Sequence, residues 1–65
     1  MNVLINGQAQ SLPGAATLAD ALAALKPTPP FAVAVNREFV PRSGYGERRL
    51  QPDDQIEVIR PVTGG

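Results

Sequence analysis

The sequence contains no cysteine, no histidine and no tryptophan. Without cysteine the chain can form neither a disulfide nor a thiolate nucleophile. Because histidine is missing too, the usual soft metal ligands and the Ser/His/Asp and Cys/His catalytic arrangements are excluded. A chain without disulfides is typical of the cytoplasm, where we expect this protein. These absences predict that the chain is acted upon by enzymes and has no catalytic residues of its own.

The charge is balanced, with six basic and six acidic side chains. A neutral chain lacks the positive potential used to bind nucleic acid or an anionic membrane, so we expect neither as a partner. The segment Met1 to Asn6 does not resemble a signal peptide, and no apolar run approaches membrane-spanning length. Basic residues gather between Lys26 and Arg49, either as ordinary solvated surface or as a steering patch for an acidic enzyme.

Two short segments have the composition of a ligand site without its spacing. Asp53, Asp54 and Glu57 match no calcium loop, and turn formation explains the two aspartates. The run 43–46, Ser-Gly-Tyr-Gly, lacks the Gly-Lys-Ser/Thr that completes a phosphate loop, so we interpret Tyr45 as a partly buried anchor. We therefore predict no metal site and no cofactor bound by this chain.

A chain of 65 residues predicts one small domain. Asn6-Gly7 is typical of a tight hairpin turn, and Thr17 with Asp20 forms a capping-box pattern at a helix start. The helix carries an apolar stripe of Leu18, Ala21, Leu22 and Leu25, and ends before Pro27. Alternation and turn residues predict strands over 2–6, 8–12, 31–36, 39–40, 48–50 and 55–60.

One helix stripe can cover only one face of a sheet. The other face is then left in water with four apolar side chains, namely Leu4, Ala32, Ala34 and Ile59. Because monomers seldom expose an apolar patch without a use, this face is a candidate docking surface for a partner protein. Scattered surface hydrophobic residues are the alternative interpretation.

The chain ends with Pro61-Val62-Thr63-Gly64-Gly65. Because proline cannot continue strand pairing, we predict a domain over 1–60 and a flexible tail over 61–65, with a reach of roughly 17 Å. Gly64 and Gly65 lack a Cβ atom and suit a slot too narrow for side chains. We predict that Thr63, Gly64 and Gly65 enter a partner's active site and that the Gly65 carboxylate is the reactive group.

Three parts of the sequence resemble the ThiS family, the small sulfur carriers of thiamine biosynthesis: Val35-Asn36 to Val40-Pro41-Arg42, the segment 50–58, and the Gly-Gly end. With the element order, the resemblance covers essentially the whole chain. It implies an α+β, ubiquitin-like β-grasp fold, with a mixed sheet of four to five strands, one main helix on one face and a flexible tail. Asp53 departs from the family's usual Gly, and Tyr45 stands near a frequent Trp; aspartate still tolerates a left-handed turn.

The resemblance also implies a function for Gly65. In the family, a ThiF-type adenylating enzyme uses ATP and magnesium to convert the terminal Gly into an acyl-adenylate. A sulfur donor enzyme then provides the sulfur of a thiocarboxylate, which the thiazole synthase ThiG consumes. These three enzymes are the implied partners, and we expect the isolated chain to be a monomer.

Three other functions are compatible with the same residues. The ending also resembles the small subunit of molybdopterin synthase, which uses a similar thiocarboxylate. The chain could instead be a protein modifier whose activated Gly65 is joined to a lysine. A plain β-grasp interaction module with an inert terminus is the third alternative.

Overall fold

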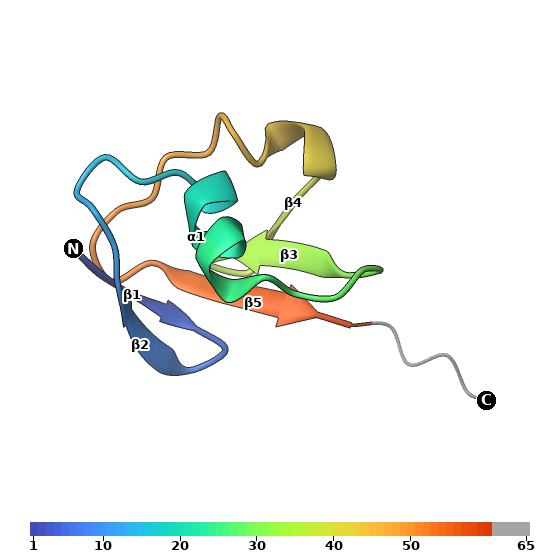
Figure 1. Ribbon diagram of the computed structural model, residues 1–65, viewed down its shortest axis with the longest axis horizontal. Helices are drawn as coiled ribbons and strands as arrows, with labels where there is room; N and C mark the ends of the chain where they lie inside the picture. The colour runs from blue at the N-terminus through green and yellow to red at the C-terminus, as the bar shows by residue number, and fades with distance from the viewer. Residues whose placement is uncertain (61–65) are drawn as a thin grey trace.

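Five strands form one mixed sheet in the order β2-β1-β5-β3-β4, and a single helix lies on one face of it (Figure 1). The computed structural model describes residues 1–60, so the predicted tail, residues 61–65, lies outside the described residues. The strands are β1 (Asn2–Ile5), β2 (Gln8–Ser11), β3 (Ala32–Val35), β4 (Glu38–Val40) and β5 (Gln55–Ile59). This architecture confirms the predicted α+β, ubiquitin-like β-grasp fold.

Two tight hairpins build the outer parts of the sheet. Asn6 and Gly7 have φ angles of 51° and 82°, and they join β1 to β2 with Ile5 opposite Gln8. Asn36 and Arg37 have φ angles of 51° and 67° and join β3 to β4. Two successive left-handed residues give the turn twist that matches a hairpin, and asparagine and glycine adopt it at low cost.

Helix α1 (Leu18–Leu25) begins and ends with defined caps. The Thr17 hydroxyl accepts a hydrogen bond from the Asp20 N–H, and the Asp20 carboxylate accepts one from the Thr17 N–H at 2.9 Å. This capping box satisfies two backbone donors and confirms the predicted start. Lys26 adopts a left-handed conformation and its N–H donates to the Leu22 carbonyl, which closes the helix before Pro27. Within residues 1–60, no helix has the length and apolarity needed to cross a membrane.

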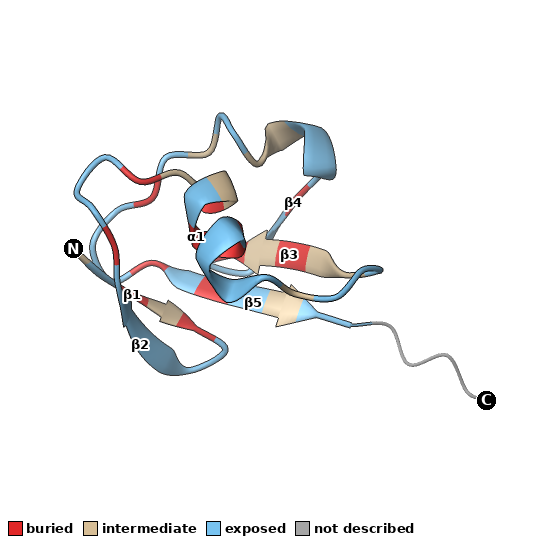
Figure 2. Ribbon diagram, viewed as in Figure 1, coloured by how far each residue is buried: buried red, intermediate tan, exposed pale blue. Residues whose placement is uncertain are grey.

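The core lies between the helix and the sheet (Figure 2). Alternate residues of the strands point into it, among them Val3, Val33, Val35 and Ile56, and the helix contributes Leu18, Ala21 and Leu22. Leu25 does not join them, because 44% of its surface is exposed. Its predicted place in the buried stripe is therefore wrong: Leu25 is the last helical residue, and the chain leaves the helix at Lys26, which adopts a left-handed conformation.

The predicted strand at residues 48–50 is also wrong. Arg49 forms only an isolated bridge with Thr17, flanked by hydrogen bonds between Leu18 and Arg48 and between Leu50 and Ala16. The pairing cannot extend because the partner segment becomes helical at Leu18. The segment 42–44 forms a single turn of 3₁₀ helix, η1 (Arg42–Gly44).

Candidate functional site

The last strand, β5, occupies the centre of the sheet and leads to the tail. It runs parallel to β1 on one side and antiparallel to β3 on the other, and its last paired residue is Ile59, opposite Ala32. Arg60 follows, and the predicted tail residues Thr63, Gly64 and Gly65 lie outside the described residues. The predicted tail therefore follows the central strand of the sheet.

The side chain of Asn6 extends the pairing of β5 toward its end. Its Oδ1 accepts a hydrogen bond from the Val58 N–H at 2.9 Å, and its Nδ2 donates to the Val58 carbonyl at 3.5 Å. The Asn6 backbone N–H also donates to the Ile56 carbonyl. An amide side chain thus takes the place of the backbone of a parallel strand after β1 has turned away into its hairpin.

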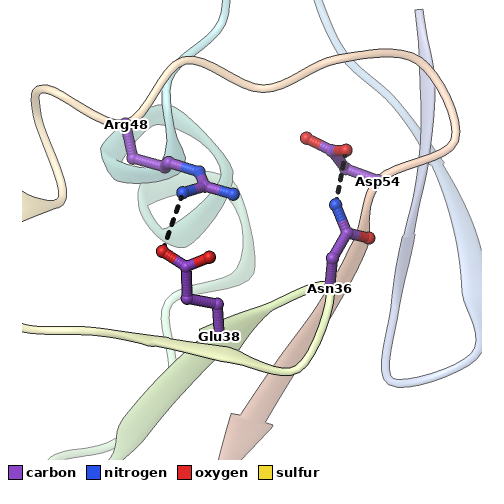
Figure 3. A network of polar contacts seen from close by, with 4 residues as sticks. All are labelled: Asn36, Glu38, Arg48 and Asp54. Carbon is purple, nitrogen blue, oxygen red and sulfur yellow. Dashed lines mark hydrogen bonds and ion pairs between the residues drawn. The ribbon is translucent and has the colours of Figure 1, made fainter.

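A second amide fixes the beginning of β5 (Figure 3). The Asn36 Nδ2 donates to the Asp54 Oδ1 at 2.9 Å, and the Asn36 Oδ1 accepts from the Gln55 N–H at 3.0 Å. The other Asp54 oxygen accepts from the Gln51 N–H at 2.8 Å, and Asp54 is only 8% exposed. Two of the segments that carry the family resemblance therefore meet here. Asp53 has a φ angle of 68°, which confirms that aspartate serves this turn in place of glycine.

Arg48 and Glu38 form the other polar contact of this region. Their side chains approach to 3.8 Å (Figure 3), and the Glu38 side chain is 74% exposed while that of Arg48 is 32% exposed. A long and exposed ion pair contributes little to stability. The Asn36 and Asp54 contact is therefore the important one for holding β5 in register.

Replacing Asp54 by alanine tests this role. The Asp54→Ala variant leaves the Gln51 N–H and the Asn36 amide without their acceptor, at a cost of about 1 to 3 kcal/mol in the free energy of unfolding. Urea unfolding followed by circular dichroism measures the loss. The control is Asp53→Asn, which keeps a residue suited to the left-handed turn and should change stability by less than about 0.5 kcal/mol. Equal effects of the two variants would contradict the role of Asp54.

The uncovered face of the sheet carries the four apolar residues that the alternation indicated. Leu4, Ala32 and Ala34 are half-buried, and Ile59 is 52% exposed. Strand pairing sets Ala32 directly opposite Ile59, so these two side chains form a continuous patch beside the point where the tail begins. The structure therefore brings these residues to one face, while their role in docking stays a prediction.

Phe39 belongs to the same face and was missed as a docking residue. It lies opposite Ala34, and 66% of its surface is exposed. The sequence does contain the signal: a two-residue turn at Asn36 and Arg37 pairs Val35 with Glu38, which places Phe39 beside Ala34 and turns Val40 toward the core. Phe39, Ala34, Ala32, Ile59 and Leu4 are called the open face below.

The other candidate ligand segments have structural roles. Among residues 1–60, no group of three or more acidic, histidine or cysteine side chains is arranged to hold a metal ion. The Tyr45 ring is half-buried and stacks on Phe31 with ring centres 6.4 Å apart, and its carbonyl accepts from the Ala19 N–H. Tyr45 is therefore the loop anchor that the sequence predicted.

Comparison with known proteins agrees with this architecture. The sequence model of the ThiS family matches residues 3–65. The fold is similar to the crystal structure of a thiamine biosynthesis protein, ThiS, from Geobacter metallireducens, with a TM-score of 0.84, 23% sequence identity and full coverage of both chains. At this identity the structural match shows the fold, and the family match shows the relationship. The chain therefore belongs to the ThiS family, whose members are sulfur carriers of thiamine biosynthesis and not catalysts.

Proposed function

We propose that the terminal carboxyl group of Gly65 carries the sulfur in this sulfur carrier and that a ThiF-type enzyme activates it. The observation that supports this most is the position of β5, which pairs with β1 at Gln55 and Ile56 and with β3 as far as Ile59, and then leads, through Arg60, into the Gly-Gly ending. A carrier that is modified at its end needs a strand fixed in the sheet, followed by a chain end with small side chains. As a member of a biosynthetic family it is proposed to act in the cytoplasm, as a monomer until it meets its partners.

The chemistry at Gly65 requires activation. A terminal carboxylate is ionised at neutral pH and resists nucleophilic attack. In the proposed sequence, a carboxylate oxygen attacks the α-phosphate of ATP, with magnesium held by the enzyme, and pyrophosphate leaves. Sulfur from the donor enzyme then attacks the acyl-adenylate carbon, and AMP leaves with the oxygen. The resulting thiocarboxylate passes its sulfur to the thiazole synthase.

The open face is the proposed surface for the adenylating enzyme. Ala32 and Ile59 of this face lie opposite each other where β5 ends, so one partner that covers the face can also receive the terminus. Two large apolar side chains on it are exposed, Phe39 at 66% and Ile59 at 52%. Burial of such side chains commonly supplies most of the free energy of an interface.

Intact-mass analysis tests the proposed modification. The purified chain is incubated with a ThiF-type enzyme, ATP, magnesium and a sulfur donor, and its mass is measured before and after. Exchange of one carboxyl oxygen for sulfur is expected, with the change located on Gly65 by fragmentation. Omission of ATP is the control and should prevent the exchange.

The other outcomes identify the alternatives. Covalent attachment to lysines of other proteins would show a modifier, and an unchanged mass would show an inert interaction module. Transfer of the sulfur to a molybdopterin precursor and not to the thiazole synthase reaction would place the chain in the other pathway. Membership of the ThiS family supports the thiazole branch.

A polar substitution on the open face should weaken docking without unfolding the domain. Phe39→Gln is expected to lower affinity for the adenylating enzyme by about 10-fold or more, because it removes an exposed apolar contact. The matched control is Leu25→Gln, which changes another exposed apolar side chain, on the helix. Isothermal titration calorimetry measures both. Equal affinities of Phe39→Gln and the unmodified chain would contradict docking through this face.

A further inference from the structure

A groove lies on the helix side of the sheet, away from the open face. It is formed by α1, the proline-rich connector that follows it, and the loop after η1, and its volume is about 620 Å³. Volumes of roughly 300 to 1,000 Å³ are typical of pockets that bury a bound group. Apolar atoms dominate the lining, with Leu22 and Ala23 from the helix and the stacked rings of Phe31 and Tyr45 opposite.

The charged side chains that line the groove are all basic. Lys26 and Arg42 contribute to its wall, and none of its lining residues, all within the described part of the chain, is acidic. The chain as a whole is neutral, so this local excess of positive charge is a property of the groove and not of the composition. Two cations beside an apolar floor attract a partner that combines carboxylates with apolar side chains.

The walls of the groove are joined to one another by their own contacts. Stacking of Phe31 on Tyr45 and the hydrogen bond from the Ala19 N–H to the Tyr45 carbonyl join the loop, the connector and the helix. The connector contains three prolines, Pro27, Pro29 and Pro30. All three line the groove, and each has a fixed φ angle. A preformed surface loses little conformational entropy when it binds, which favours affinity for a short segment.

The position of the groove favours a segment of another protein as its occupant. The start of β3 lies beside the end of β5 (Figure 1). Phe31, which lines the groove, immediately precedes Ala32, the partner of Ile59, so one rim of the groove is near the end of β5. A protein that accepts the tail therefore comes within reach of the groove, a step that rests on the proposed function. The groove is also half-open, which suits a chain segment better than a small molecule that must be enclosed.

We infer that this groove is a second docking surface, which binds an acidic segment of a partner protein. The segment binds through apolar side chains spaced along one of its own faces. The apolar side chains fill the space between Ala23 and the Phe31 and Tyr45 rings, and flanking carboxylates pair with Lys26 and Arg42. Because the groove and the open face lie on opposite sides of the sheet, the carrier can be held through either surface or through both.

A titration with a defined peptide tests the inference. The probe is the synthetic peptide Asp-Leu-Glu-Glu-Leu-Leu-Asp, whose leucines follow the i, i+3, i+4 spacing of groove-binding segments. Tyr45 is the only tyrosine and tryptophan is absent, so tyrosine fluorescence reports directly on the groove. A saturable change with a Kd on the order of 1 mM or below is expected. A peptide with lysine in place of each acidic residue should bind at least about 10-fold more weakly.

Matched variants locate the binding. Ala23 lines the groove and Ala24 does not, although both are exposed on the same helix, so Ala23→Glu should weaken peptide binding at least about 10-fold and Ala24→Glu should not. Arg42→Glu and Arg49→Glu form a second pair, in which only Arg42 lines the groove. Thermal unfolding of each variant verifies that the domain is intact, and the Arg42 pair provides the test if Ala23→Glu fails to fold.

Four results would overturn the inference. The first is the lack of a saturable fluorescence change, and the second is equal binding of the acidic and lysine peptides. The third is an equal effect of the two substitutions within both variant pairs. The fourth is binding of dodecanoate but not of the peptide, which would indicate that the groove binds a small amphiphile. Self-association abolished by Ala23→Glu would assign the groove to a second copy of the chain. None of these readouts involves Gly65, so failure here and failure of the sulfur-carrier proposal are distinguishable.

Discussion

Gly65→Val is expected to lower the rate of adenylation by the ThiF-type enzyme by about 100-fold or more, with no change in folding. A branched Cβ prevents the backbone from following a slot shaped for glycine and displaces the carboxylate from the α-phosphate of ATP. The buried core is built from residues between Val3 and Ile56, so a side chain at position 65 is not expected to disturb it. Pyrophosphate release measures adenylation, and circular dichroism measures folding.

Another glycine provides the control for that substitution. A Cβ atom at Gly14 would meet no heavy atom within 4 Å, and Gly14 is not in the left-handed region. Gly14→Val therefore makes the same chemical change in the turn before the helix, and it should keep both folding and adenylation. Normal adenylation of Gly65→Val would disprove the proposed threading of the terminus. Loss of adenylation in both variants would point to a general effect of the substitution.

Leu18→Ala should have the largest effect on stability. Leu18 has 0% of its surface exposed, between the helix start and the sheet. Truncating a buried leucine costs about 2 to 5 kcal/mol through lost burial and the cavity left behind. A domain of this size has a total stability of only about 3 to 10 kcal/mol, so the variant is expected to be largely unfolded at 37 °C. Leu22→Ala falls in the same range for the same reason.

The same helix contains the matched control. Leu25→Ala removes the same atoms from a side chain that is 44% exposed, and it should cost less than about 1 kcal/mol. Urea unfolding of both variants gives the difference. Comparable losses at the two positions would mean that the helix packs through a wider face than the structure shows.

Local chemistry explains why most of the fold could be predicted. The Asn6-Gly7 turn, the Thr17 and Asp20 capping box and the strand alternation each depend on residues near one another in sequence, and the structure has all of them. The open face followed from the same alternation, since a residue next to a core residue on a strand must point the other way.

The errors came where distant partners decide the outcome. Leu25 fits the helical stripe, but at the end of the helix the rest of the domain leaves 44% of its surface exposed. The segment 48–50 has strand composition, but its partner begins a helix at Leu18 after a single bridge. The side-chain contacts of Asn6 with Val58 and of Asn36 with Asp54 were not predicted either, because they depend on which strands become neighbours in the sheet.

The parallel pairing of β1 with β5 joins the two ends of the domain, since Leu4 lies opposite Gln55. Leu4 and Ile59 reach a common surface only after this closure, which a nascent or partly unfolded polypeptide has not made. Under the proposed docking, an enzyme that binds this face before it consumes ATP at the terminus accepts only a folded domain. The proposed docking surface would then restrict activation to molecules that have completed folding.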